Sequence, residues 1–428
     1  MSLTRDDLLA DLHNAGKPTE RWRVGAEFER HLLMPNGHPL PYFGDRGVRW
    51  LLESLVDHGY ELYFEGENPI AAHRDEHWVT LEPGSQFELS GSATGELQPV
   101  FDEARAFEEL TDSLLADSGT KQVALGYTPY AAIEDVPWTP KGRYVLMRAH
   151  LAKTGALAHR MMKGTCAVQA SYDFADEQDC ARKVRLATAL GPLTTAMFAN
   201  SPYKEGGLAG FKSYRGHIWT QTDPARAGMP DAAALFDFEK WVDYLLHVPM
   251  MFKKQGDAWV DSRGQTFAEW MASSEPPTWD DWELHLTSVF PEVRVKRTIE
   301  VRGADCVPLP LAMSFVALFK GLFYCQLAQE QAMGLAERFV AHGTKDERFD
   351  IACRGGLEGV VGGQPLAAWA DELVDLCDQA LGRCAPSDRP WLRPLMEQIA
   401  TGKSPAGTLL DALGPTPEPS ALIAACTS

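Results

Sequence analysis

The sequence contains no pair of cysteines at CxxC spacing, although eight cysteines occur in its 428 residues. This absence excludes zinc-ribbon and thioredoxin-like sites and favours free thiols in a reducing compartment. The nucleotide-binding patterns GxxxxGKS/T and GxGxxG are also missing, as are the GxSxG and HExxH patterns of serine hydrolases and zinc peptidases. If the protein uses a nucleotide, it must hold it through metal ions and residues of a sheet.

Long apolar runs and an excess of positive charge are missing as well. The longest apolar run, residues 307–319, is about a dozen residues long and contains Pro308 and Pro310, whereas about 20 residues are needed to span a bilayer. The N-terminal residues lack the basic start and apolar run of an export signal. With 40 Lys and Arg against 59 Asp and Glu, the formal net charge of -19 repels nucleic acid and anionic lipid. We therefore expect a cytoplasmic protein that binds neither nucleic acid nor membrane.

The composition that is present, 45% hydrophobic and 23% charged, is that of a globular protein with a sizeable core. No linker rich in Gly, Ser or Pro divides the chain. We therefore predict one interlocked α+β domain over residues 1–428, with a sheet-bearing core over about 1–310 and a helical layer over about 311–428.

Hydrophobic periodicity predicts the elements of this domain. Predicted helices cover residues 44–58, 97–117 and about 177–200, together with most of the chain after 305. Predicted strands cover residues 77–84, 85–91, 123–129, 165–174 and 294–305, with a turn at Pro83-Gly84.

Acidic residues recur on the predicted strands. Glu27 and Glu29 stand two apart in RVGAEFER and therefore share one strand face. Glu82 and Glu88 flank the Pro83-Gly84 turn, and Glu300 lies in RTIEVRGAD. For any single segment, the simpler interpretation is a polar strand face turned to water. Several carboxylates on one concave face would repel one another, and carboxylate-only ligands favour Mg²⁺ or Mn²⁺.

Basic residues in apolar surroundings could hold an anionic substrate. They form two groups, Lys141, Arg143 and Arg148 in KGRYVLMR, and Lys212, Arg215 and His217 in KSYRGHIW. Arg215 is the first candidate, because a guanidinium makes paired hydrogen bonds to a carboxylate or phosphate. The alternative is a structural arginine paired with a nearby acid. His217 fits a packed histidine better than a base, and Cys306 fits a buried structural thiol better than a nucleophile.

The chain also resembles a known family over about residues 20–310. The segments that carry the resemblance are RVGAEFER, LEPGSQFELSG, PKGRYVLMR, GTCAVQASYDF, FANSPYKEG, GFKSYRGHIWTQTD and FPEVRVKRTIEVRGAD. In order and spacing they resemble the glutamate-cysteine ligases of the plant and proteobacterial type. The resemblance implies a glutamine-synthetase-like antiparallel sheet curved into a funnel, with helices packed outside. It also implies ATP with Mg²⁺, Mn²⁺ being an alternative, and ligation of the glutamate γ-carboxylate to the amine of cysteine.

Site residues follow from the resemblance position by position. The metal-binding acids of the family fall on Glu27, Glu29, Glu82, Glu88 and Glu300. The phosphate-stabilising arginine falls on Arg302, and the arginine expected to hold the glutamate α-carboxylate falls on Arg215. Substrate-binding positions further include Gln169, Arg143 and Trp219. The plant-type first motif usually reads TEHEK where this chain has AEFER, so both acids are kept while their neighbours differ.

The resemblance leaves several functions open. The expected reaction is the first step of glutathione synthesis, with glutamate, cysteine and ATP as small-molecule substrates of a monomer or homodimer. The same scaffold could instead use another amine acceptor, or make γ-glutamylcysteine for ergothioneine synthesis. A third hypothesis is a catalytically silent homologue that binds glutamate or a nucleotide as a regulator. The retained acids and arginines argue against it, because a binder does not need a full set of mutually repelling carboxylates.

Overall fold

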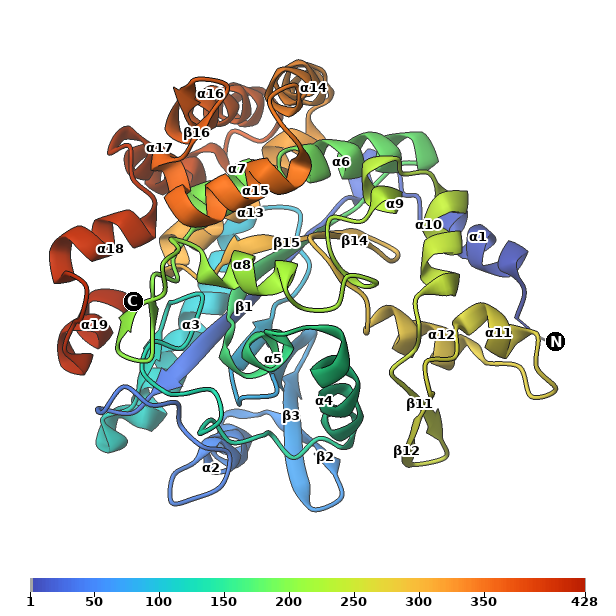
Figure 1. Cartoon of the computed structure of the whole chain (residues 1–428), viewed down its shortest axis with the longest axis vertical. Coiled ribbons are helices and arrows are strands. Elements are labelled where there is room, and N and C mark those ends of the chain that lie inside the picture. The colour runs from blue at the N-terminus through green and yellow to red at the C-terminus, as the bar shows by residue number, and fades with distance from the viewer. Residues whose placement is uncertain (1–2, 428) are drawn as a thin grey trace.

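A nine-stranded antiparallel sheet forms the centre of the molecule (Figure 1). The structure is a computed structural model that describes residues 3–427. The strands lie in the order β14, β15, β7, β1, β5, β4, β3, β2, and β6 pairs with the end of β1. Their bounds are β1 Val24–Leu33, β2 Glu61–Glu65, β3 Asn68–Arg74, β4 His77–Leu81, β5 Phe87–Ser90, β6 Lys121–Val123, β7 Ala167–Tyr172, β14 Val293–Val295 and β15 Ile299–Asp305.

Helices pack around this sheet and dominate the last third of the chain. The helices before residue 300 are α1 Arg5–Asn14, α2 Val48–Ser54, α3 Leu97–Leu115, α4 Gly142–Thr154, α5 Ala158–Gly164, α6 Glu177–Ala189, α7 Gly191–Phe198, α8 Tyr214–Thr220, α9 Asp231–Ala234, α10 Phe238–His247, α11 Phe267–Met271 and α12 Trp279–Leu286. The later ones are α13 Leu309–Tyr324, α14 Gln326–Val340, α15 Lys345–Gly355, α16 Leu366–Cys384, α17 Arg393–Ala400, α18 Pro405–Leu413 and α19 Pro419–Cys426. The predicted helical C-terminal third is confirmed.

Strand β1 separates the two faces of the sheet by simple alternation. Val24, Ala26 and Phe28 are buried in the main hydrophobic core, while Glu27 and Glu29 point to the opposite face. On the core side, α13 packs against β7 and β1, and α3 packs against β1 and β6. The sheet therefore has one face covered by helices and one face left for a site.

Helix α13 is buried along almost its whole length and joins the helical layer to the sheet. Its Lys320 forms an ion pair with Asp388 and donates to the carbonyl of Gly95 at 2.6 Å. The main core includes residues from Leu3 to Ile399, so it draws on both parts of the chain. Among residues 3–427, no single helix is long and apolar enough to cross a membrane. The pair α13 and α14 is long and apolar enough when the two are counted together, but they are bent by 101° relative to each other.

Three predicted elements differ from the structure. The strand predicted over 294–305 is a hairpin of β14 and β15, because the chain turns back at residues 296–298. The helix predicted over about 177–200 is divided into α6 and α7, because Pro192 has no N–H and cannot continue a preceding helix. The strand predicted over 123–129 ends at Val123. Beyond it, Gly126 lies against Asp305, where a Cβ would come within 2.6 Å of the carboxyl carbon. Its N–H donates to the carbonyl of Asn200 at 2.9 Å, so this segment is an ordered loop.

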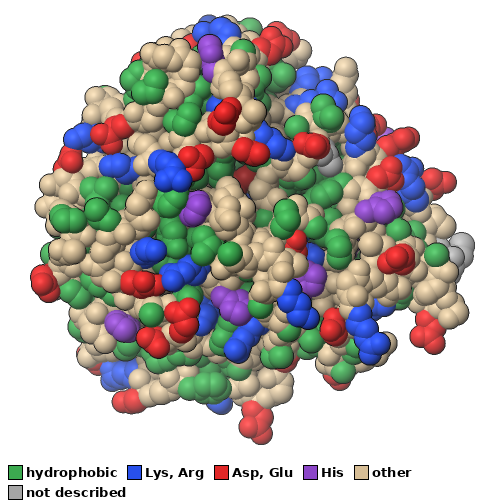
Figure 2. Space-filling model, in the orientation of Figure 1, with side chains coloured by type: hydrophobic (Ala, Val, Ile, Leu, Met, Phe, Trp, Pro, Cys, Tyr) green, Lys and Arg blue, Asp and Glu red, His purple; other side chains and the backbone are tan. Residues whose placement is uncertain are grey.

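On the surface, charges of both signs are mixed. Figure 2 shows acidic and basic side chains interspersed over the face seen in Figure 1. The remaining strands form two-stranded sheets outside the central sheet. Their pairs are β8 Tyr203–Lys204 with β9 Gly207–Leu208, β10 Ala227–Gly228 with β13 Phe290–Pro291, β11 Phe252–Gln255 with β12 Ala258–Asp261, and β16 Val360–Val361 with β17 Gln364–Pro365.

Candidate active site

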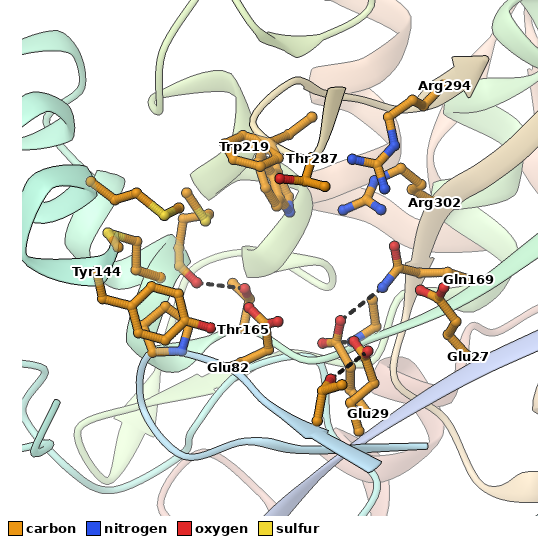
Figure 3. Close-up of a pocket in the computed structure, with 18 of the residues that line it drawn as sticks. Glu27, Glu29, Glu82, Tyr144, Thr165, Gln169, Trp219, Thr287, Arg294 and Arg302 are labelled. Carbon is orange, nitrogen blue, oxygen red and sulfur yellow. Dashed lines mark hydrogen bonds between the residues drawn. The ribbon is translucent and has the colours of Figure 1, made fainter. Parts of the chain in front are cut away.

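A cavity of about 300 Å³ lies over the open face of the sheet (Figure 3). Its floor comes from β1, β5 and β7, and its walls come from α4, α5, α8 and the β14–β15 pair. These segments are far apart in the sequence, so the cavity exists only when the whole sheet is assembled. We call it the catalytic cavity below.

Carboxylates cover the floor in cross-strand rows. Glu29 on β1 lies opposite Glu88 on β5, which in turn lies opposite Thr80 on β4. The neighbouring row places Glu27 opposite Gln169 on β7. All five side chains line the cavity. The prediction that Glu27 and Glu29 share one face is confirmed, and directly opposed like charges such as Glu29 and Glu88 are unfavourable without a cation between them.

The surroundings of these acids shift their pKa values upward. Loss of solvent, followed by the nearby charges of Glu88 and Glu300, raises the pKa of Glu27 to about 8. Burial and the charges of Glu88 and Glu82 raise the pKa of Glu29 well above its ordinary value. Burial and Glu82 raise the pKa of Glu88 in the same direction. The cavity therefore favours either protons or a bound cation on its floor.

Hydrogen bonds fix where these carboxylates point. Glu29 accepts from the backbone N–H of Ala167 at 2.7 Å and from the amide of Gln169 at 2.9 Å. Glu88 accepts from the hydroxyls of Thr80 at 2.8 Å and Ser90 at 3.2 Å. Each carboxylate is thus oriented before any ligand arrives.

Glu82 reaches the cavity from a turn and not from a strand. Its carbonyl accepts from the N–H of Ser85 at 2.9 Å, and Ser85 has a left-handed φ of 65°. Gly84 packs so closely against the carbonyl of Lys163 that a Cβ would lie 2.2 Å from that oxygen. Only glycine fits at this position. The side-chain amide of Gln86 donates a hydrogen bond to the carbonyl of Thr165 at 2.9 Å. The turn is therefore anchored to the opposite wall.

Three cations, Arg294, Lys296 and Arg302, line the side of the cavity formed by β14 and β15. Figure 3 shows Arg294 and Arg302 side by side above Glu27. Glu300 holds both arginines, since Arg294 donates to its two oxygens at 2.7 and 3.0 Å and Arg302 forms a further ion pair with it. Burial alone would raise the pKa of Glu300, but these two guanidinium groups hold it well below its ordinary value. The result is a rigid pair of arginines facing the acidic floor.

Arg215 is positioned by a buried network around Asp305. Asp305 accepts from the hydroxyls of Ser201 at 2.6 Å and Ser213 at 2.8 Å. Ser213 caps the start of α8 by accepting from Gly216 N–H at 3.0 Å. The Arg215 guanidinium donates to the carbonyl of Arg302 at 2.8 Å and lies 3.9 Å from Asp305. This network joins α8 to the end of β15.

Helix α4 supplies the opposite wall. Lys141 and Tyr144 both donate to the carbonyl of Leu81 at 2.8 Å. Burial and the neighbouring Arg143 lower the pKa of Lys141 to about 8. Three buried polar atoms of the cavity wall have no hydrogen-bond partner within residues 3–427, and they are Arg143 Nε, Gln169 Oε1 and Trp219 Nε1. Buried polar groups are normally paired, so these atoms are candidates for contacts with a ligand.

Comparison with known proteins identifies the family. The model of glutamate-cysteine ligase family 2 (GCS2) matches residues 23–427. The chain is 36% identical over 419 residues to the chloroplastic glutamate--cysteine ligase of Brassica juncea, covering 96% of this chain and 81% of that protein. It is also 36% identical over 422 residues to glutamate--cysteine ligase B of Oryza sativa subsp. japonica, covering 96% and 84%.

This chain belongs to glutamate-cysteine ligase family 2.

Solved structures agree with the GCS2 assignment at the level of the fold. The Francisella tularensis glutamate-cysteine ligase, solved in complex with AMP, superposes with a TM-score of 0.57 at 11% identity, covering 95% of this chain and 87% of that chain. A bifunctional glutathione synthetase from Pasteurella multocida gives 0.54 at 12% identity, covering 97% and 53%. The predicted fold class is therefore confirmed.

The structure brings most residues predicted for this GCS2 site into one cavity. Those that line it are Glu27, Glu29, Glu82, Glu88, Arg143, Gln169, Arg215, Trp219 and Arg302. Glu300 contacts the cavity through its arginine partners. Three other basic candidates lie elsewhere: Arg148 stacks on Trp138, Lys212 pairs with Glu358, and His217 stacks on Phe211 at 4.1 Å. Cys306 is buried and donates to the carbonyl of Glu29 at 3.0 Å, as a structural thiol would.

Sequence reasoning missed Arg294 and Lys296. Both stand in the RVKRTIEVRGAD segment, two residues apart. This is the spacing that identified Glu27 and Glu29, although Lys296 lies in the turn just after β14. The apolar part of the wall, which includes Met147, Met161 and Met162, carries no comparable sequence signal, because methionines are common in ordinary cores.

The donor set fits a divalent cation that is completed by a ligand. Within residues 3–427 no three His, Cys, Asp or Glu side chains already form a metal-binding group. Mg²⁺ commonly uses one or two carboxylates together with water and substrate phosphates, and needs no preformed protein cage. The oriented, mutually repelling carboxylates of Glu27, Glu29 and Glu88 provide such a partial site.

Proposed function

We propose that this chain is an ATP-dependent ligase that joins the γ-carboxylate of glutamate to the amine of L-cysteine. The products are γ-glutamylcysteine, ADP and phosphate. This reaction is the first step of glutathione synthesis. The observation that carries the proposal is one cavity in which oriented carboxylates face the fixed pair Arg294 and Arg302. The names of the GCS2 relatives support the same reaction.

The chemistry explains why such a site has no obvious nucleophile. A carboxylate is a poor electrophile, so it must be activated before an amine can attack it. Transfer of the γ-phosphoryl group of ATP to glutamate gives a γ-glutamyl phosphate, from which phosphate then leaves. Phosphoryl transfer depends on positioning and on neutralising charge. Glu300 holds the side chains of Arg294 and Arg302 in place. The two guanidinium groups can therefore donate hydrogen bonds to the oxygens of the transferring phosphoryl group.

Glutamate is assigned to the side of the cavity near α8. Arg215 is buried and oriented by the Asp305 network, and its guanidinium suits the α-carboxylate. Gln169, Arg143 and Trp219 each carry a buried polar atom that has no partner among residues 3–427. We assign those atoms to substrate contacts.

Mg²⁺, or Mn²⁺ in its place, is assigned to the carboxylates on the floor. Glu27, Glu29, Glu82 and Glu88, which line the cavity, would hold it. Glu300, the fifth acid predicted for this set, already accepts hydrogen bonds from Arg294 and Arg302. When bound, the ion would neutralise phosphate charge. Arg215, Arg294 and Arg302, which hydrogen bonds within the protein hold in place, would orient the substrates.

A product assay tests this proposal. The purified protein should convert glutamate, cysteine and ATP into γ-glutamylcysteine, ADP and phosphate in the presence of Mg²⁺, with the product identified by its mass. Arg143→Ala should lose activity, whereas Arg148→Ala, on the same helix but outside the cavity, should keep it. ATP turnover with a different amine would favour another acceptor, and glutamate binding without turnover would favour a regulator. The cytoplasmic location and the monomeric or homodimeric state stay predictions.

A further inference from the structure

A second cavity, of about 680 Å³, lies beside the catalytic cavity. We call it the Glu292 cavity. It is bordered by α8, the segment of residues 224–231 and α15, and Trp219 is the residue that lines both cavities. Apart from Trp219, none of the residues that line it has a role in the reaction proposed above, although Glu292 and His217 stand in two of the segments that carry the family resemblance.

Glu292 is the unusual residue in this wall. The residue is 6% exposed, and its Oε2 has no hydrogen-bond partner among residues 3–427. Within residues 3–427 no lysine, arginine or histidine forms an ion pair with this carboxylate. The oxygen rests against Gly303, where a Cβ would come within 2.5 Å of it. A buried carboxylate without a partner is costly, so a cation that reaches this wall would be bound favourably.

Nearby protein cations do not serve as that partner. Arg215 and Arg302 lie close enough to lower the pKa of Glu292, yet burial dominates and leaves it raised. Lys345, also in this wall, donates to the carbonyl of Met229 at 2.7 Å and to Asp231 at 3.0 Å. The lysine is therefore already bound by other groups.

The remaining lining limits the chemistry of a ligand. The exposed rim carries Asp346 and Asp350, so it attracts positive charge. The inner wall includes Phe349, Met229 and Trp219, which suit an apolar body. No three acidic, histidine or cysteine side chains among residues 3–427 are grouped as metal ligands. A space of about 680 Å³ with one inner carboxylate therefore fits an organic cation better than a bare metal ion.

We propose that the Glu292 cavity binds a small organic ammonium ion, with the Glu292 carboxylate as its anionic partner and Phe349 and Met229 as its apolar wall. This binding does not depend on the proposed ligase reaction and is measured without turnover. Because Trp219 belongs to both cavities, the site lies directly behind the wall assigned to glutamate.

A titration with a matched pair of probes tests the proposal. The full-length protein is titrated by calorimetry with n-butylammonium and, separately, with n-butanol, which has the same chain without the charge. We expect n-butylammonium to bind at least about tenfold more tightly than n-butanol, the size of one charge-assisted hydrogen bond. Glu292→Gln should weaken n-butylammonium binding by at least about tenfold and leave n-butanol binding unchanged.

The matched control is Glu88→Gln, which makes the same substitution at a buried carboxylate of the catalytic cavity. The acidic floor of the catalytic cavity can also attract the probe, so the binding step that Glu292→Gln removes should still be present in Glu88→Gln. Loss of binding in Glu88→Gln with retention in Glu292→Gln would place the probe in the catalytic cavity and overturn the proposal, as would equal affinity for the two probes.

If Glu292→Gln does not fold, Asp350→Lys replaces it. Asp350 is an exposed rim residue whose bond is to Arg354 on the surface of the same helix, so its substitution should not disturb the core. The added positive charge should weaken n-butylammonium binding severalfold. Unchanged binding in this variant would count against the Glu292 cavity.

Discussion

At the scale of single residues, Arg215 and Arg302 have different surroundings and should have different kinetic roles. Arg215 is held by the Asp305 network near Trp219, whereas Arg302 is paired with Glu300 beside Arg294. Arg215→Lys keeps the charge but cannot make the paired contact to an α-carboxylate. We expect the glutamate KM to rise by about 10- to 100-fold and the ATP KM to change much less, as steady-state kinetics would measure. Equal weakening of both substrates would give Arg215 a structural role.

Arg302→Ala should act on kcat. Its proposed partner is the charge that develops as the phosphoryl group transfers, so binding of either amino acid should change little. Loss of one such donor commonly lowers the rate by about 10²- to 10³-fold. Varying ATP, glutamate and cysteine in turn would measure this. A normal kcat with a raised glutamate KM would mean that the two arginines have exchanged roles.

Glu27 should make the stability of the metal-free protein depend on pH. Its pKa is about 8 in the folded protein and about 4.3 in an unfolded chain. Between these values the folded state holds a proton that the unfolded state has released, so the free energy of unfolding falls as the pH rises through this window. Urea unfolding in a chelator at pH 6 and pH 8.5 should show this decrease, and Glu27→Gln should reduce it. An identical decrease in the variant would contradict the assigned pKa.

The same variant, Glu27→Gln, should lose ligase activity when Mg²⁺ is limiting.

The two-residue spacing of Glu27 and Glu29 was sufficient to predict the acidic face, because residues two apart on a strand point to the same side of the sheet. It was not sufficient for Glu300, whose ion pairs with Arg294 and Arg302 depend on how β14 folds back onto β15. The metal role of Glu300 therefore stays a prediction, and the structure adds that it also orients two arginines.

At the scale of elements, the start of α8 couples stability to substrate binding. Ser213 caps this short helix and donates to Asp305. Ser213→Ala should lower the free energy of unfolding by about 1 kcal/mol and also raise the glutamate KM, because Arg215 lies two residues further on. Thr266→Ala, which removes the cap of α11, is the matched control. It should cost similar stability and leave KM unchanged, and a raised KM in both would indicate a general effect of destabilisation.

Element boundaries were predictable where local chemistry decides them. The amphipathic helix predicted at 97–117 is α3, Leu97–Leu115, because its apolar spacing continues without a breaker. The prediction missed the break between α6 and α7, although Gly191-Pro192 marks it in the sequence. The end of β6 was not predictable, because it depends on the remote Asp305, which lies against Gly126.

At the scale of the whole molecule, the predicted single domain has a direct test. The main core takes residues from the sheet and from the C-terminal helices, and α13 covers β7 and β1. We therefore expect one cooperative unfolding transition by calorimetry. A chain that ends at residue 310 should fail to give a stable folded protein, because the apolar face of the sheet would be exposed. Two separate unfolding transitions, or a stable fragment of residues 1–310, would contradict the prediction of a single domain.

The central place of β1 in the sheet also affects how the protein is made. Glu29 on β1 and its partner Gln169 on β7 are 140 positions apart in the chain. At roughly 5 to 20 residues per second, a ribosome needs about 7 to 28 s to synthesise that interval. During this time one edge of β1 has no neighbouring strand, and an unpaired strand edge is a template for association with other chains. The arrangement that gathers the carboxylates on one floor thus leaves the nascent polypeptide with an open strand edge for many seconds before the sheet can close.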